Sequence, residues 1–573
     1  MDPPPRAPAP GVRLEKILAA AVLLTALLFR LWALDEKPLH FDEGVNGNFV
    51  DRMVAEGFYH YDPTNYHGPL HFYVLFVFQT LLGREPWVLR LPIALLSTAS
   101  VGLVLAFRST IGRQAALISA FAMAVSPGLV FYGRYAIHES WLVFFLLLTF
   151  WGLAGLRHAN SRGRLWAFGL GICGMLLTKE THLLHLAAMG LAVPTLRLLE
   201  RFSPSAPSSP PEPETRGKHK DLIPLLATCG GLLLFFYSGA LLDSSGLTGF
   251  FQSFLAWAQT GTGGESGHEK PWPYWLELLL RYEWPALLGL AASGFVVLPG
   301  IQRPLRYLAI YAGGTLVAYS IVPYKTPWCV ISMLWPWLLL FGVAIAHLAA
   351  RWDRWCVHTA AGLLLAYSTG MSGLLNFKSA TDEEEPYVYV QTLPEIRDLL
   401  DPLRNATRQN PQLLHATGYV LLPELFPWTW LLGRHSRVAY LNPPDFPEEL
   451  APPEFALVDP SLLETFEARL DQPYFKFALR VRGSSPDECF VFLRAATFAS
   501  QFPGRDPEFL PEPEPPSPEE PPAKPKDSSD LGDAPPSETP PAADPPPEKL
   551  PGPRPIPPLP ILDRKTGELV PEP

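Results

Sequence analysis

Two adjacent carboxylates, Asp42 and Glu43, stand immediately after the first strongly apolar segment of the chain. A carboxylate at the edge of a membrane is costly unless it is solvated, paired or used in chemistry. In chemistry, such a group takes the proton of an attacking hydroxyl as a general base. The alternative is that the two residues only cap the helix that runs toward Val50. The sequence does not separate Asp42 from Glu43, and both are candidate catalytic residues.

Polar and aromatic residues in two other stretches are candidate binding residues. One stretch follows the carboxylate pair, and the other follows a glycine-rich run at 261–264. The candidates are Tyr59, Tyr66, His67, His71, His268 and Glu269. The alternative is that the tyrosines anchor the chain at a membrane interface and the histidines are solvated. The glycine-rich run lacks the GK[ST] sequence of a nucleotide-binding loop, so we interpret it as a mobile outer lid.

Three cations, Arg134, Lys179 and Lys325, are candidate ligands of a phosphate. A fixed cation stabilises the charge that develops on a departing phosphate. Each cation also has a structural alternative. Arg134 can pair with Glu139, Lys179 can pair with Glu180, and Lys325 can extend toward lipid headgroups.

The composition is that of a membrane protein. Of 573 residues, 48% are hydrophobic and only 17% are charged, whereas a soluble domain has about 25% charged residues. The 16 Trp and 34 Phe fit a chain that meets lipid. No basic stripe appears outside short loops, so nucleic acid is not an expected partner. The five Cys show neither a CxxC pair nor metal-ligand spacing.

The apolar segments predict about eleven membrane-spanning helices. They are 17–34, 90–108, 114–132, 141–157, 165–179, 181–199, 222–240, 284–301, 306–322, 327–350 and 355–376. Lys and Arg collect on the cytoplasmic side of membrane proteins. Every predicted inner loop is basic if the N-terminus is inside, the C-terminus is outside, and segment 69–83 lies along the outer surface.

This topology divides the chain into four parts. Residues 1–16 are a disordered cytoplasmic start, and 17–376 are the membrane domain. The membrane domain has outer loops at 35–89 and 241–283 and a disordered cytoplasmic loop at 200–221. Residues 377–500 contain strand-like runs (YVYVQT, RVAYLN, FALVDP and FKFALRV) with helices at 394–409 and 462–470, which predicts a small α/β domain outside the membrane. Residues 501–573 are rich in Pro and acidic residues and predict a disordered tail.

Several sequence blocks together resemble the GT-C superfamily of membrane glycosyltransferases, which includes protein O-mannosyltransferases and aminoarabinose lipid A transferases. The blocks are HFDEG, YHGPLHFY, GRYAIHE at 133–139, TKE at 178–180, GTGGESGHEKPWPYW at 261–275 followed by RYEWP, YSIVPYKTPW at 319–328 and FPWTWLLGRHSRVAY at 426–440. The most similar family is the "flippase activity-associated" family named from archaeal N-glycosylation. The resemblance covers roughly residues 17–490. It implies a helical GT-C fold with a functional acidic residue in a large first outer loop.

The resemblance also implies an activity, in which the polar and aromatic candidates would bind the sugar or its acceptor. A sugar would move from a polyprenyl-phosphate donor to an acceptor hydroxyl of a glycan, lipid or protein on the outer side of the inner membrane, with inversion at the anomeric carbon. Some members of the superfamily need a divalent metal, and here Asp42 and Glu139 would hold Mg²⁺ or Mn²⁺. The related families usually have an acidic residue where Glu139 stands, often Asp, and here His138 precedes it. The alternative function is a flippase-associated or transport protein for lipid-linked sugars, without catalysis.

Overall fold

The structure is a computed structural model that describes residues 10–156, 162–206, 218–262, 268–447, 450–483, 488–511, 561–563 and 568–570. Residues Met1–Glu512 form one compact unit and Pro513–Pro573 form a second.

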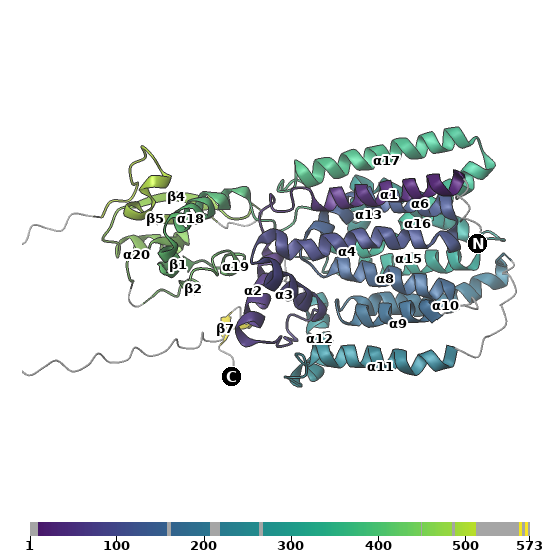
Figure 1. Ribbon diagram of the computed structural model, residues 1–573, viewed down its shortest axis with the longest axis horizontal. Helices are drawn as coiled ribbons and strands as arrows, with labels where there is room; N and C mark the ends of the chain where they lie inside the picture. The colour runs from purple at the N-terminus through teal and green to yellow at the C-terminus, as the bar shows by residue number, and fades with distance from the viewer. Residues whose placement is uncertain are drawn as a thin grey trace, which may run out of the picture. The chain divides into compact units, whose positions relative to one another are not determined.

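A helix lies within or across each of the eleven segments that the sequence predicts to span. These helices are α1 (Pro10–Leu31), α4 (Pro86–Ala106), α6 (Arg113–Val125), α8 (Glu139–Gly155), α9 (Arg162–Leu176), α10 (His182–Phe202), α11 (Lys218–Tyr237), α14 (Trp284–Ser293), α15 (Arg303–Ile321), α16 (Val330–Arg351) and α17 (Arg354–Phe377). Figure 1 shows them side by side as one bundle. Within the described residues, four helical segments are individually long and apolar enough to cross a membrane: 86–111, 182–202, 220–237 and 327–351. The count of eleven crossings and their orientation remain a prediction.

The bundle is organised around α16, which is buried without interruption from Val330 to Gly342. Helix α14 packs closely against it, because Gly289 presents no side chain at the contact. A Cβ atom at Gly289 would lie 1.9 Å from the carbonyl oxygen of Trp337. The start of the bundle corrects the predicted boundary at residue 16. Helix α1 already begins at Pro10, a residue whose fixed φ suits the first turn of a helix.

The bundle also contains shorter helices. They are α2 (Phe41–Glu56), α3 (Leu70–Leu82), α5 (Arg108–Ile111), which lies in the turn between α4 and α6, α7 (Pro127–Phe131), α12 (Ser245–Thr262) and α13 (Tyr274–Tyr282). Figure 1 shows α2 and α3 at the end of the bundle that faces the sheet. With 13 residues, α3 is shorter than the roughly 20 residues that a span needs.

A five-stranded sheet follows the last long helix. Its strands are β1 (Thr417–Leu421), β2 (Arg437–Leu441), β3 (Phe455–Val458), β4 (Tyr474–Arg480) and β5 (Glu488–Arg494), in the order β2-β1-β3-β5-β4. Strands β2, β1 and β3 are parallel, and β5 and β4 join antiparallel. The accompanying helices are α18 (Arg397–Gln409), α19 (Trp428–Leu431), α20 (Leu463–Glu467) and α21 (Ala495–Phe498). This confirms the predicted mixture of strands and helices between 377 and 500.

One predicted strand, YVYVQT at 387–392, is wrong. The segment makes only an isolated bridge, between Thr392 and Arg482. Its aromatic side chains pack against the helical bundle instead, which removes them from the sheet. Tyr387 is fully buried and stacks on Tyr282 with ring centroids 4.3 Å apart.

The first residues of the predicted tail are ordered. Phe509 and Tyr474 exchange two backbone hydrogen bonds of 3.0 Å, so this part of the tail prediction is corrected: the chain pairs with β4 because an apolar ring there covers Phe492. In the second unit, β6 (Ile561–Asp563) pairs antiparallel with β7 (Glu568–Val570). The remaining residues of the tail, and 207–217 of the predicted cytoplasmic loop, lie outside the described residues.

Candidate functional site

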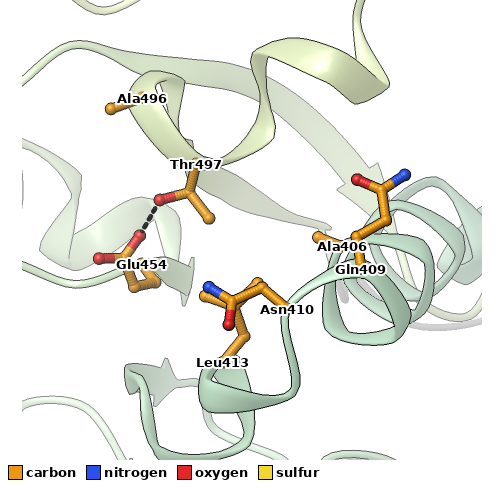
Figure 2. Close-up of a pocket in the computed structure, with 7 residues that line it drawn as sticks. All are labelled: Ala406, Gln409, Asn410, Leu413, Glu454, Ala496 and Thr497. Atoms are coloured by element: carbon orange, nitrogen blue, oxygen red, sulfur yellow. Dashed lines mark hydrogen bonds between the residues drawn. The ribbon is translucent and has the colours of Figure 1, made fainter.

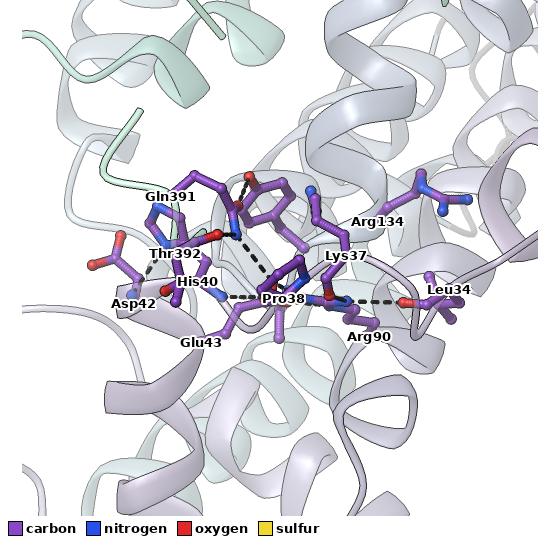
Figure 3. A network of polar contacts seen from close by, with 12 residues as sticks. Leu34, Lys37, Pro38, His40, Asp42, Glu43, Arg90, Arg134, Gln391 and Thr392 are labelled. Atoms are coloured by element: carbon purple, nitrogen blue, oxygen red, sulfur yellow. Dashed lines mark hydrogen bonds and ion pairs between the residues drawn. The ribbon is translucent and has the colours of Figure 1, made fainter. Parts of the chain in front are cut away.

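Glu43 is fully buried and its carboxylate accepts four hydrogen bonds. Arg90 donates to both oxygens at 2.8 and 2.6 Å, and the backbone N–H groups of Ala136 and His40 donate at 2.9 Å each. The bond from His40 closes a capping box at the start of α2. Arg90 also donates to the carbonyls of residues 34, 37 and 38, so the pair ties the first outer loop to α4 (Figure 3). This geometry favours the structural alternative for Glu43.

Glu43 makes the free energy of unfolding depend on pH in the acidic range. Burial alone would raise the pKa of Glu43, but Arg90, Lys37 and the His40 N–H outweigh burial and lower the pKa from 4.5 to about 2. A lowered folded-state pKa means that the stabilisation is complete above the unfolded-state value and is lost as the pH falls toward about 2. The difference corresponds to about 3 kcal/mol.

We therefore expect the melting temperature in detergent to fall between pH 4.5 and pH 2 and to fall less steeply in Arg90→Lys, which loses the two-pronged contact. The measurement is a series of melting curves over that range. Equal slopes in wild type and Arg90→Lys would show that Glu43 carries no such linkage.

Asp42 has a different environment from its neighbour. It is only partly buried, and Figure 3 shows its carboxylate on the opposite side of the view from Arg90. Its backbone N–H donates to His40 Nδ1 at 3.0 Å, while His40 Nε2 donates to the carbonyl of Tyr389 at 2.8 Å. Burial, then Glu269 and Asp42, raise the pKa of the Tyr389 hydroxyl. Asp42 is connected to the Tyr389 segment through His40. The structure thus separates the two adjacent carboxylates.

An aromatic and basic surface lies beside Asp42. Residues 268–270 pair with 323–325 through backbone hydrogen bonds of 3.0 and 3.1 Å. His268 and Lys270 both face Tyr389: His268 Nδ1 lies 2.6 Å from its hydroxyl, and Lys270 Nζ lies 5.5 Å from its ring centroid. Trp328 adds a third ring, 6.0 Å from Tyr389 and 5.8 Å from His40. We call His40, Asp42, His268, Lys270, Trp328 and Tyr389 the Asp42 site.

Two of the predicted phosphate ligands hold backbone carbonyls. Arg134 is 4% exposed and donates to the carbonyls of residues 29, 30, 32 and 33, at the end of α1. Lys325 is 2% exposed and donates to the carbonyls of Lys270 and Val322 at 3.0 and 2.6 Å. An ammonium has three donors, so Lys325 keeps one after these two bonds.

Lys179, the third predicted phosphate ligand, lies between two carboxylates. Its Nζ is 2.8 Å from Glu139 and 3.5 Å from Glu180, and His67 bonds Glu180 at 2.8 Å. Burial would raise the pKa of Glu180, but Lys179 and His67 lower it to about 2. The cluster is buried, and two carboxylates exceed one ammonium. The carboxylates thus neutralise the Lys179 ammonium and leave no positive charge for a phosphate, which favours the structural alternative for Lys179. Glu139 pairs with Lys179 rather than with Arg134.

The remaining predicted sugar ligands divide into two groups. Burial and then Tyr66 and Asp42 raise the pKa of the Tyr324 hydroxyl, and the Tyr66 ring contacts His67. Glu269 is bridged to Tyr324 through the backbone, so Glu269 adjoins the Asp42 site. Tyr59 instead stacks on Phe72 at 4.9 Å within a hydrophobic cluster. His71 is fully buried between the Ala136 carbonyl and the indole N–H of Trp141.

The predicted metal pair does not fit a metal site. Among the described residues, no group of three or more His, Cys, Asp or Glu side chains is arranged to hold a metal ion. Glu139 is already paired with Lys179 at 2.8 Å, and a metal would have to displace that ammonium. The prediction of Mg²⁺ or Mn²⁺ at Asp42 and Glu139 thus gains no support from the donor set.

The helix that carries Asp42 is braced by the segment that contains α19. A Cβ atom at Gly44 would lie 2.7 Å from Pro427, and one at Gly47 would lie 2.4 Å from the Trp430 ring. The two glycines are three residues apart and share one face of α2. Arg84 joins the same contact: it binds Asp51 of α2 at 2.7 Å, lies over the Trp430 ring at 4.3 Å and donates to the Trp430 carbonyl.

Adding a methyl group at Gly47 should therefore loosen the brace. Overpacking typically costs about 1–3 kcal/mol, so Gly47→Ala should lower the melting temperature of the purified chain. Gly370→Ala is the matched control, because Gly370 lies in a helix with open space around it, and alanine there is neutral or mildly stabilising. Combining Gly47→Ala with Trp430→Leu should cost less than the sum of the two changes. Strict additivity would contradict the contact.

A hollow lies in the sheet region, at α18 and α21. It encloses about 370 Å³ and is lined by Ala406, Gln409, Asn410, Leu413, Glu454, Ala496 and Thr497 (Figure 2). Its one carboxylate is already engaged, since Glu454 accepts from Arg494 at 2.9 Å and from the Thr497 hydroxyl. The walls offer few free polar groups, so the Asp42 site is the better candidate.

The chain is similar to known proteins in part of its sequence and in its fold. The family model described as "Dolichyl-phosphate-mannose-protein mannosyltransferase" matches residues 66–201. No curated protein matches the chain. The crystal structure of ArnT from Cupriavidus metallidurans bound to undecaprenyl phosphate has a TM-score of 0.54 at 17% identity, and the match covers 85% of this chain and 98% of that one. The chain has the GT-C fold.

Other solved structures match over similar spans. The apo crystal structure of the same ArnT gives a TM-score of 0.54 at 17% identity and covers 85% of this chain and 99% of that one. The oligosaccharyltransferase of Archaeoglobus fulgidus, crystallised with Zn and sulfate, gives 0.44 at 12% identity over 83% of this chain and 73% of that one. The family-model match over residues 66–201 and the fold likeness to ArnT confirm the sequence resemblance to the GT-C superfamily.

Proposed function

We propose that this chain is a membrane glycosyltransferase that moves a sugar from a polyprenyl-phosphate donor to an acceptor hydroxyl on the outer side of the membrane, with inversion. The observation that supports it best is the Asp42 site. Its carboxylate, Asp42, is partly buried at the end of a GT-C bundle, and its ammonium, Lys270, is half-buried and lies over the Tyr389 ring. The donor class is suggested by ArnT, whose structure contains undecaprenyl phosphate.

The chemistry assigns Asp42 the role of general base. As the acceptor oxygen forms its bond to the anomeric carbon, Asp42 takes the hydroxyl proton and the bond from that carbon to the phosphate oxygen breaks. The anomeric carbon develops positive charge, which electron-rich aromatic faces tolerate well. Trp328 and Tyr389, which adjoin His40 in the Asp42 site, supply such faces. One direct displacement inverts the anomeric centre.

The departing polyprenyl phosphate gains charge and needs a fixed cation. Lys270 is suited to this role because its ammonium lies over the Tyr389 ring of the Asp42 site. Lys325, in the paired segment 323–325, stabilises the position of Lys270 by donating to its carbonyl at 3.0 Å. Lys179 and Arg134 are then structural, because carboxylates and helix-end carbonyls respectively engage them.

Deletion of the gene in its native host tests this function. Lipid-linked sugars and surface glycans would be profiled by mass spectrometry in the parent, the deletion strain and the strain restored with wild type. The proposal expects one sugar to disappear from a surface glycan and the corresponding lipid-linked sugar to accumulate. Loss of transport without catalysis would instead leave the lipid-linked sugar on the inner side and block every sugar that depends on it.

A further inference from the structure

The parallel part of the sheet contains a topological switch point. The chain runs from β1 to β2 on one side and then to β3 on the other side of β1, giving the order β2-β1-β3. In open sheets, connections that leave in opposite directions open a crevice at the carboxyl ends of the two strands, and ligands bind there. In this chain that place lies after Leu421 of β1 and Val458 of β3.

A hollow occupies this position. It is lined by Leu422, Pro423, Glu424, Phe426, Trp428, Asp459, Val481, Arg482, Glu488 and Cys489. Leu422, Pro423 and Glu424 directly follow β1, and Asp459 directly follows β3. The space that admits the centres of water-sized groups is about 30 Å³. This is room for one or two hydroxyl groups, with the rest of a ligand lying across the opening.

One wall of the hollow contains a donor that lacks an acceptor. Trp428 is fully buried, and its indole N–H has no hydrogen-bond partner among the described residues. A buried donor without a partner is unfavourable, because it has lost its hydrogen bond to water. A hydroxyl oxygen of a ligand in the hollow would satisfy it. This observation is independent of the strand topology and points to the same place.

The hollow adjoins the start of the helix that carries Asp42. The Phe41 ring, next to Asp42 in sequence, lies 5.7 Å from the ring of Phe426 and 5.2 Å from the guanidinium of Arg482. Both residues line the hollow. A molecule that lies across the opening therefore extends toward the Asp42 site.

The charges select the kind of ligand. Among the described lining residues, the carboxylates of Glu424, Asp459 and Glu488 outnumber the guanidinium of Arg482. A phosphate is repelled by such a surface. Asp459 Oδ1 accepts from the backbone N–H and the hydroxyl of Ser461. The second oxygen of Asp459, the indole N–H of Trp428 and the aromatic walls instead suit the hydroxyls of an uncharged saccharide.

We propose that this hollow, the β1/β3 hollow, binds the acceptor, and that the acceptor is an uncharged saccharide. The proposal rests on the proposed function, because it takes Asp42 as the group that receives the acceptor proton. It adds a binding site in the sheet region and a substrate class for the acceptor side of the reaction.

Saturation-transfer NMR on the full chain in lipid nanodiscs tests the proposal. The probes are neutral methyl glycosides of a hexose, a pentose and an N-acetylhexosamine, with inorganic phosphate as competitor. The variants are Trp428→Phe, which removes the N–H and keeps a ring, and Asp459→Asn, which keeps a residue able to cap the turn at Ser461. Gln409→Ala, in the other hollow of Figure 2, is the matched control.

We expect a signal from at least one glycoside, a reduction of about fivefold in Trp428→Phe and in Asp459→Asn, and no change with Gln409→Ala or with added phosphate. No signal from any glycoside, a signal that both variants leave unchanged, or displacement by phosphate would each overturn the proposal. Asp42→Asn separates the two claims, because it should abolish transfer while keeping the glycoside signal. If Asp42→Asn keeps transfer, the proposed function fails whatever the hollow binds.

Discussion

Replacing Asp42 by Asn should abolish sugar transfer while the protein remains folded. Loss of a general base typically lowers a rate by about 10²–10⁴-fold, so the product should fall at least about 100-fold. The fold should tolerate the change, because the Asp42 carboxylate is partly exposed and faces away from the Arg90–Glu43 pair (Figure 3). The measurement is restoration of the surface glycan in the deletion strain, at matched protein abundance.

Glu56→Gln is the control for Asp42→Asn. Glu56 ends the same helix, and its carboxylate is 37% exposed with only surface contacts to Arg52 and His60. Such exposed pairs contribute little, so this variant should restore the glycan as well as wild type. Full restoration by Asp42→Asn would remove Asp42 from the mechanism.

Replacing Glu43 by Gln, in contrast, should lower the stability of the fold. Removing one partner of a buried ion pair costs about 3–5 kcal/mol, because Arg90 would remain charged and fully buried. Gln has one neutral oxygen and an NH2 group in place of the two anionic oxygens. The NH2 group cannot accept the hydrogen bonds that one carboxylate oxygen accepts from Arg90 and from Ala136 or His40. We expect lower abundance in the membrane and a strongly lowered melting temperature in detergent.

Glu85→Gln is the matched control for Glu43→Gln. Glu85 also pairs with an arginine, Arg434, at 2.9 Å, but the two side chains are 40% and 52% exposed. That change should cost about 0–1 kcal/mol. In addition, Arg90→Gln together with Glu43→Gln should be less damaging than the two single costs combined. A stable, folded Glu43→Gln with wild-type melting would contradict the structural role of Glu43.

Much of the fold was predictable because each long helix is encoded locally. A run of apolar residues of sufficient length identifies a helix wherever its partners lie, and all eleven predicted segments contain one. The strands at 437–441, 455–458 and 474–480 also carry their own signal. The segment 387–392 failed because it has the composition of a strand, and only the long-range stack of Tyr387 on Tyr282 decides its place.

The site was only partly predictable for the same reason. Asp42 and Glu43 are adjacent and chemically alike, and the difference between them depends on Arg90, 47 residues away. A signal was present, since an arginine inside an apolar helix needs a partner. Lys270 was missed because its place over Tyr389 comes from the pairing of 268–270 with 323–325.

The sequence also contains a signal for the close packing on α2. Gly44 and Gly47 are three residues apart in a helix, which is a spacing typical of close packing. Their partners, Pro427 and Trp430, lie almost four hundred residues later, so the sequence alone does not identify what packs there.

The most direct test of the central claim is sugar transfer by the purified chain in proteoliposomes. The donor would be the polyprenyl-phosphate sugar that accumulates in the deletion strain, and the acceptor would be the truncated glycan from the same strain. We expect the product to carry the sugar with inverted anomeric configuration, with one polyprenyl phosphate released per sugar and no product with Asp42→Asn. Movement of the intact lipid-linked sugar across the bilayer without cleavage of its phosphate bond would contradict the account.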